Sequence, residues 1–127
     1  MPRYQKHFSL EEARALMPSL RQAFHDMHHR RDRVEKADEK LATLLRKTTG
    51  DIGGTVVNSL MMDLLQINTQ LRLVQECGVV VKDLDRGLVD FPHMREGREV
   101  FLCWELDEDD IEFWHDIDAG YQGRERL

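Results

Sequence analysis

The sequence predicts an α+β fold: a long antiparallel two-helix hairpin followed by a small antiparallel four-stranded meander. Apolar residues recur at alternating spacings of three and four in the first half, a glycine-rich segment interrupts this repeat, and from Val79 the apolar period becomes two. A chain of 127 residues has the usual length of one domain. We therefore expect one domain over 1–127, with helices at 9–47 and 55–77, a β module at 79–118 and a tail at 119–127.

A capping box marks the beginning of the first helix. Ser9 and Glu12 stand three residues apart, so each side chain can accept a hydrogen bond from the backbone N–H of the other residue. Pro18 lies inside this helix and predicts a kink, or a break near Met17. The apolar positions form a narrow seam, which consists of Leu10, Ala13, Met17, Leu20, Phe24, Met27, Val34, Leu41 and Leu45.

The second helix has a wider apolar face, and Gly78 supplies the left-handed cap that is typical of a helix end. The short connection between the helices predicts that they pack antiparallel. Counting back from this connection leaves the stretch from Leu10 to Phe24 without a helical partner, so we expect it to pack on the β module. The seam of the second helix consists of Val57, Leu60, Leu64, Ile67, Leu71 and Val74.

The β module is expected to form two hairpins. VVVKDL and LVDFP flank an Asp-Arg-Gly turn, which places Lys82 opposite Asp90. EVFLCWEL and IEFWHDI flank an acidic Asp-Glu-Asp-Asp turn. With Leu106 opposite Ile111, Cys103 pairs with Trp114, and His115 faces the core on the other side of the sheet. The second face then has mixed polarity and is partly exposed to solvent. It consists of Phe101, Cys103, Glu105, Glu112, Trp114 and Asp116.

Charge and hydropathy exclude several classes of partner. Residues 1–47 carry 11 basic and 7 acidic side chains, whereas residues 48–127 carry 7 basic and 17 acidic ones, within a net charge of −6. The acidic half repels phosphate backbones, and the Arg30-Arg31-Arg33 stretch is a small footprint for nucleic acid. No apolar run approaches the roughly 20 residues of a membrane helix, and the start lacks the apolar core of a signal peptide. We expect a cytoplasmic protein with no membrane or nucleic-acid partner.

Candidate ligand- or partner-binding residues gather at the predicted junction of helix and sheet and in the tail. An imidazole beside carboxylates could bind a metal ion, an exposed aromatic pair would suit a partner, and Arg124 could reach back to Glu105 or Asp116. Cys103 and His115 lie on opposite faces in the predicted register, so a thiol nucleophile with a histidine base is not expected. No spacing is diagnostic of metal ligands or catalytic residues. The candidates are Asp90, Cys103, Glu105, Trp114, His115, Asp116 and Arg124.

Two strings in the β module, VKDL…GLVDFP and LCWEL…WH…G…GR, together with the upstream FSLEEARALMPSLR, resemble the bacterial family named domain of unknown function 2203. The resemblance covers nearly the whole chain. It implies the same order of elements, and it implies no activity, cofactor or site residues.

We expect a non-enzymatic protein-interaction module that forms a homo-oligomer, a homodimer in the simplest case, through its helices, because long apolar seams commonly self-associate. A different protein partner is also compatible with this surface. The alternative is a metal- or small-molecule-binding protein with a site at the junction of helix and sheet, near Asp90, Glu105 and His115. The sequence leaves the identity of any cofactor unknown. Leu41→Asp or Leu64→Asp is expected to unfold the chain by burying a charge in the seam.

Overall fold

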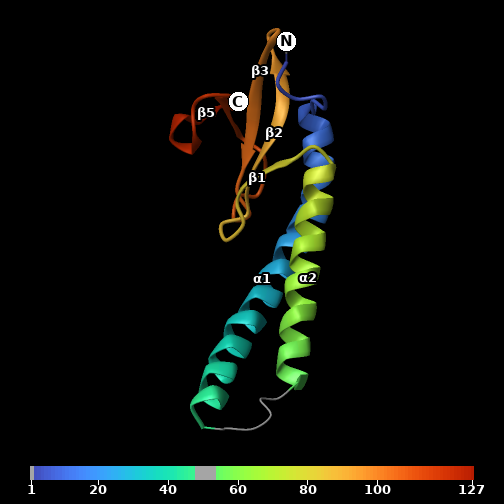
Figure 1. Cartoon of the computed structure of the whole chain (residues 1–127). Coiled ribbons are helices and arrows are strands. Elements are labelled where there is room, and N and C mark those ends of the chain that lie inside the picture. The colour runs from blue at the N-terminus through green and yellow to red at the C-terminus, as the bar shows by residue number, and fades with distance from the viewer. Residues whose placement is uncertain (1, 48–53) are drawn as a thin grey trace. The chain divides into compact units, whose positions relative to one another are not determined.

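The computed structural model describes residues 2–47 and 54–127 of the chain. Two helices precede one antiparallel sheet, which confirms the predicted α+β class and order of elements (Figure 1). The predicted connection between the helices, at 48–53, lies outside the described residues. The elements are α1 (Leu10–Lys47), α2 (Gly54–Glu76), β1 (Val80–Asp83), β2 (Leu88–Arg95), β3 (Arg98–Trp104), β4 (Phe113–Asp116), the 3₁₀ helix η1 (Tyr121–Gly123) and β5 (Glu125–Arg126).

The chain divides into two compact units. The sheet unit contains residues 2–24 and 73–127, and the helical unit contains the described residues of 25–72. Each helix therefore contributes residues to both units. Over its described residues, neither helix has a stretch that is both long and apolar enough to span a membrane.

The helix ends follow the predicted signals. Ser9 Oγ accepts a hydrogen bond of 3.0 Å from the N–H of Glu12, and Glu12 Oε1 accepts one of 2.9 Å from the N–H of Ser9, so the capping box is present. α2 is followed by Gly78, whose φ of 97° is the left-handed conformation expected of the cap. α1 continues through Pro18, so the alternative of a break near Met17 is wrong.

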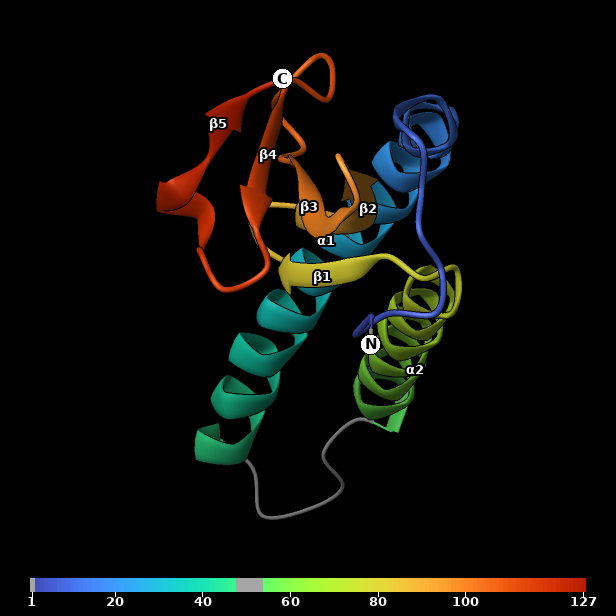
Figure 2. The same ribbon diagram turned by 90° about the horizontal axis from the view of Figure 1, so that it is seen from above.

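The sheet has the strand order β1-β2-β3-β4-β5, and every neighbouring pair is antiparallel (Figure 2). The expected four-stranded meander is present, and the tail adds β5 at its edge. The register expected for the first hairpin is wrong, because Asp90 pairs with Val80 rather than with Lys82. A bulge after Val81 shifts the pairing between these two strands.

The register expected for the second hairpin is also wrong, by one residue. Phe101 pairs with His115, and Cys103 pairs with Phe113 rather than with Trp114. A slip of one residue turns every side chain of β4 to the other face of the sheet. His115 therefore lies on the same face as Cys103, in contrast to the prediction.

The segment between β3 and β4 explains this slip. The ring N–H of Trp104 donates to the carbonyl of Glu108 at 3.0 Å, and the backbone N–H of Glu105 donates to the carboxylate of Glu108 at 2.8 Å. Arg21 of α1 donates to three carbonyls of the same segment. Ile111, which we expected to begin the last strand, is instead fully buried before it. The turn is longer than the tight one that the sequence suggested.

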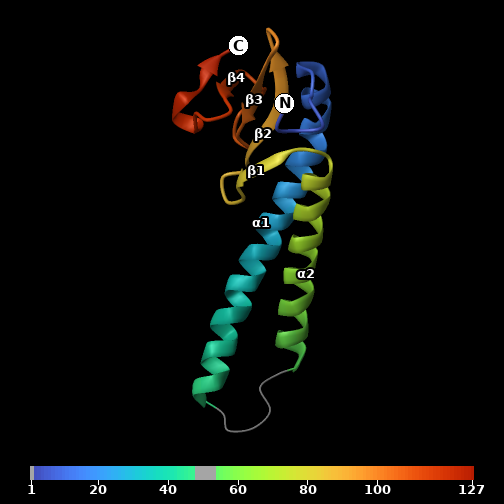
Figure 3. The ribbon, with the colours of Figure 1, turned by 45° about the horizontal axis from the view of Figure 1, so that its top comes forward.

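The main core of the sheet unit lies between α1 and one face of the sheet (Figure 3). The guanidinium of Arg21 stacks on the ring of Trp104 at 5.1 Å, and the N–H of Phe8 donates to the carbonyl of Pro92 at 2.7 Å. The expectation that the stretch from Leu10 to Phe24 packs on the β module is confirmed. Buried residues of this core include Phe8, Ala13, Met17, Leu20, Phe24, Val89, Phe91, Val100, Leu102, Trp104 and Trp114.

Candidate metal centre

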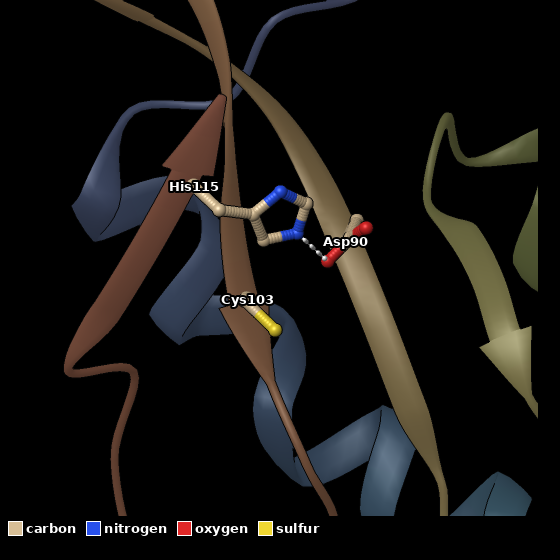
Figure 4. Close-up of side chains that lie close together, drawn as sticks. All are labelled: Asp90, Cys103 and His115. Carbon is tan, nitrogen blue, oxygen red and sulfur yellow. Dashed lines mark hydrogen bonds and ion pairs between the residues drawn. The ribbon is translucent and has the colours of Figure 1, made fainter. Parts of the chain in front are cut away.

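Three side chains with different metal-binding groups meet on the other face of the sheet. Cys103 of β3 lies directly opposite Asp90 of β2, and Phe101, two residues before Cys103, lies opposite His115 of β4. Because alternate residues of a strand share a face, Asp90, Cys103 and His115 point to the same side (Figure 4). Their ligand atoms all lie within 4.8 Å of one another.

All three side chains are withdrawn from solvent. Relative exposure is 2% for Asp90, 1% for Cys103 and 2% for His115. A buried carboxylate is strongly destabilising unless it is paired, and here Nε2 of His115 lies 3.1 Å from Oδ1 of Asp90. The other ring nitrogen, Nδ1, lies 2.8 Å from the backbone carbonyl oxygen of Asp116.

Both ring nitrogens of His115 therefore face oxygen acceptors. Nδ1 must carry a hydrogen to bond the Asp116 carbonyl, and a second proton must lie between Nε2 and the Asp90 carboxylate. Burial opposes the charged imidazole, but the hydrogen bonds to Asp90 and to the Asp116 carbonyl outweigh it and raise the pKa of His115. An Nδ1–H held by a backbone carbonyl is the arrangement that leaves Nε2 available for a metal ion.

The thiol of Cys103 is not an activated nucleophile. Burial, followed by the negative charge of Asp90, raises the pKa of Cys103 to about 12, so the neutral thiol is the stable form at pH 7. His115 has both nitrogens engaged and offers no free position to take the thiol proton. A metal cation among the three groups would reverse this preference, because a coordinating thiol loses its proton.

Glu105 and Arg124 form a separate polar cluster. Arg86 Nε lies 2.7 Å from Glu105 Oε1, the Tyr121 hydroxyl donates to Glu105 Oε2 at 3.1 Å, and Arg124 Nη1 lies 3.9 Å from that oxygen. The reach of Arg124 to Glu105, which we expected, is confirmed, and Arg124 also pairs with Glu108. The hydrogen bond from Arg86 is the main reason that the pKa of Glu105 lies below its usual range. The protein's own cations thus compensate this carboxylate.

Trp114 and the side chain of Asp116 point away from the three metal-binding groups. Trp114 lies on the core face, where the guanidinium groups of Arg95 and Arg98 stack on its ring at 4.7 and 5.8 Å. The carboxylate of Asp116 pairs with Arg98 at 3.1 Å. Of the two alternatives for Phe101 and Trp114, an exposed pair or a covered one, the structure shows covered rings, because Trp114 is 8% and Phe101 1% exposed. The register slip separates these two rings onto different faces.

A cavity of about 140 Å³ adjoins the three groups. Two polar residues of its wall, Lys82 and Tyr121, were not among the candidates from the sequence. Lys82 was assigned to a cross-strand pair with Asp90, and Tyr121 lies in η1, a short turn without periodic signal. The wall consists of Lys82, Leu88, Asp90, Cys103, His115, Ala119, Gly120 and Tyr121.

Comparison with known proteins identifies the family. A family model described as "Uncharacterized conserved protein (DUF2203)" matches residues 6–127. The chain belongs to the DUF2203 family. The resemblance seen in the sequence is thereby confirmed, and the three grouped residues all lie in the matched DUF2203 region. No curated protein and no solved structure matches the chain.

The helical unit carries a different kind of surface. Asp63 of α2 is buried and pairs with Arg30 and Arg33 of α1, each at 3.1 Å. The α2 segment 54–72 has one other charged residue, Arg72. Several seam residues that we expected to be buried are exposed, because two helices alone cover only a narrow stripe of each other. The large apolar residues of the helical unit with a relative solvent exposure of 39–55% are Leu45, Val57, Met61, Met62, Leu64 and Leu65.

Proposed function

We propose that this protein binds one divalent transition-metal ion of the zinc type through Asp90, Cys103 and His115. The observation that carries the proposal is the meeting of three buried ligand atoms within 4.8 Å of one another. Thiolate, imidazole and carboxylate are the donors that zinc accepts in proteins. The sulfur donor disfavours magnesium and calcium, which prefer oxygen.

The protonation of the cluster supports this proposal. Without a metal ion, the thiol of Cys103 holds one proton, and a second proton lies between His115 and Asp90. A divalent cation that displaces both protons leaves the net charge of the buried cluster unchanged. The ion then adds no uncompensated charge to the interior, which is the main energetic obstacle to burying an ion.

The spacing of the groups also supports it. With metal–ligand distances of about 2.0–2.3 Å, the donor atoms of a tetrahedral zinc site lie roughly 3–4 Å apart. The Nε2–Oδ1 distance of 3.1 Å between His115 and Asp90 is already in this range. The three residues stand on neighbouring paired strands, so small side-chain rotations suffice to close the site.

Cobalt(II) provides a direct test, because it replaces zinc and reports its ligands by visible absorption. We expect the metal-free protein to bind one equivalent, with the intense bands of four-coordinate cobalt and a near-ultraviolet sulfur-to-cobalt charge-transfer band. Cys103→Ser should remove the charge-transfer band. It should also weaken zinc binding by more than the roughly 10–100-fold that loss of an outer-shell partner produces.

The second cysteine provides a matched control. Cys77 is exposed and free, so Cys77→Ser removes one thiol without touching the cluster and should leave the cobalt spectrum unchanged. Asp90→Asn tests a second ligand, and circular dichroism establishes that each variant is folded. The proposal is wrong if the charge-transfer band survives in Cys103→Ser, or if the wild type binds neither cobalt nor zinc at millimolar concentrations.

A second candidate function, self-association, is favoured by the exposed apolar surface of the helical unit. Apolar surface gains free energy when it leaves water, and Asp63 is already neutralised by Arg30 and Arg33. The matching surface must therefore be apolar and almost uncharged, and the helical unit of a second copy offers such a surface. A symmetric dimer would apply the same patch twice.

Sedimentation velocity over a range of concentrations tests this second candidate. We expect a dimer that Leu65→Glu converts to a monomer, because the change places a charge in the patch. Met94→Glu is the control, since Met94 is 44% exposed but lies in the sheet unit. A monomeric wild type, or equal behaviour of the two variants, would exclude a dimer through this surface.

A further inference from the structure

The cavity beside the three metal-binding groups has room for a small molecule. Its volume of about 140 Å³ corresponds to roughly four or five water molecules at 30 Å³ each. Leu88 and Ala119 provide apolar wall, whereas Lys82 and Tyr121 provide polar wall. The cavity touches Asp90, Cys103 and His115 together, so a molecule within it would meet the proposed metal ion.

Three protein donors leave one position of a zinc-type ion open. Structural zinc sites are closed by four protein ligands, whereas sites that act on small molecules keep a position for water or substrate. Among the described residues, the cluster that could hold a metal ion contains three members and no fourth. The cavity is the space from which an external ligand can complete the coordination.

The charges around the cavity select the ligand. A divalent ion with one thiolate and one carboxylate forms a neutral site, and Lys82 in the same cavity wall adds a positive charge. The ammonium group of Lys82 lies 5.4 Å from the centre of the Phe101 ring, a cation–π contact that holds it at the wall.

Among the described residues that line the cavity, Lys82 is the one charged side chain outside the proposed ligand set. The Tyr121 hydroxyl donates to Glu105, and Arg86 and Arg124 compensate the charge of that carboxylate. The potential within the loaded cavity is therefore positive. A cationic ligand would be repelled, and a neutral ligand would gain nothing from Lys82.

We infer that the cavity binds a small carboxylate anion, which takes the open metal position and is attracted by Lys82. This inference rests on the proposed metal site. The volume accommodates an anion of a few non-hydrogen atoms, such as formate or acetate, and the apolar wall formed by Leu88 and Ala119 suits a short alkyl group.

Acetate added to the cobalt-loaded protein is the test. We expect acetate to shift the visible cobalt bands with a saturable dependence on concentration, while acetamide, its neutral analogue, leaves them unchanged. Lys82→Met keeps an unbranched side chain one atom shorter and removes its charge, and it should weaken acetate binding about tenfold. Lys6→Met is the matched control, because Lys6 also lies over a phenylalanine ring, that of Phe8, at 5.1 Å, and is not part of the cavity wall.

The outcomes separate the two proposals. A protein that gives no cobalt spectrum overturns both the metal site and the anion site. A cobalt spectrum that acetate does not change, or that acetamide changes equally, overturns the anion site alone. Equal acetate affinity in Lys82→Met and wild type, measured on variants with the same cobalt stoichiometry, overturns the role of Lys82.

Discussion

The sheet unit and the helical unit depart from the usual distribution of residues in opposite ways. The sheet unit buries an acid, a thiol and an imidazole on one face of its sheet, at Asp90, Cys103 and His115. The helical unit leaves methionine and leucine side chains of α2 about half exposed. Both departures raise the free energy of the isolated chain. Binding would relieve both: binding of a cation in the sheet unit, and of an apolar surface in the helical unit.

The buried acids of the two units show how different these departures are. Asp63 in the helical unit meets two permanent cations, Arg30 and Arg33, so its charge is compensated within the fold. Asp90 pairs with His115, whose charge depends on a proton. A carboxylate compensated by arginine is structural, whereas one compensated by an exchangeable proton can accept a metal ion in its place.

The largest difference between the units should appear when a large apolar residue is removed. Trp104→Ala in the sheet unit empties a fully buried site and should lower the free energy of unfolding by about 3–5 kcal/mol. Leu64→Ala should lower it by less than about 1 kcal/mol, because Leu64 is 46% exposed. Urea unfolding of dilute protein measures both values.

Leu64→Asp should remain folded, in contrast to the expectation from the seam pattern. An unfolded Leu64→Asp would show that this surface is covered in the native protein.

Zinc should stabilise only one of the two units. At a free concentration one hundred times its dissociation constant, a ligand of the native state adds about 2.7 kcal/mol, which raises the melting temperature of a unit of this size by roughly 10–20 °C. A chelator should reverse the increase, and Cys103→Ser should abolish it. Asp63→Asn should retain the full zinc effect. Loss of the effect in Asp63→Asn would show that the two units do not behave as separate bodies.

Removal of the charge of Asp63 should have a smaller effect than removal of Trp104. Asp63→Asn leaves Arg30 and Arg33 facing a neutral amide, and the loss of charge-assisted hydrogen bonds should lower the free energy of unfolding by about 2 kcal/mol. Hydrogen exchange of the amides of residues 54–72 measures the change locally. The amides of the sheet unit should keep their protection, and equal loss of protection in both units would contradict the division of the chain.

The order of elements could be predicted from the sequence because it depends on local signals. The capping box at Ser9, the glycine after α2 and the change of apolar period at Val79 each act over a few residues, and each is seen in the structure. The burial of the stretch from Leu10 to Phe24 could also be predicted from the sequence, because the apolar seam of this stretch had no partner on the second helix. The exposure of Leu64 could not be predicted, because periodicity shows that a face is apolar and does not show what covers it.

The candidate metal centre could be predicted only in part. Asp90, Cys103 and His115 were each recognised as candidates, but the sequence placed Cys103 and His115 on opposite faces. The error lies in one residue of register, which depends on how Trp104 and Arg21 hold the segment before β4. Such contacts are non-local, so strand alternation alone cannot reveal them. Lys82 was missed for the same reason, since a bulge after Val81 changes its neighbour.

The smallest predicted effect concerns acid stability and lies in the sheet unit. The half-buried carboxylate of Glu99 accepts hydrogen bonds from the backbone N–H groups of Arg3, at 2.8 Å, and Tyr4, at 3.1 Å, and lies 2.6 Å from Nε2 of His7. The N–H of Arg3 contributes most to lowering the pKa of Glu99, and burial opposes the shift. Because the pKa is lower in the folded than in the unfolded protein, the stabilisation is complete above the ordinary glutamate pKa and is lost as the pH falls through the folded value.

Glu99→Gln tests this linkage by removing the titrating group. The difference in free energy of unfolding between wild type and Glu99→Gln should be largest near pH 7 and should shrink steadily below about pH 4.5, the ordinary range of a glutamate. Urea titrations at a series of pH values measure it, and Glu96→Gln, at an exposed position of the β2–β3 turn, corrects for the change of net charge. A difference that stays constant with pH would show that the hydrogen bonds at Glu99 hold the N-terminal segment without favouring the ionised form. In that case the carboxylate would act only as a hydrogen-bond acceptor, a role that the amide oxygen of a glutamine also fills.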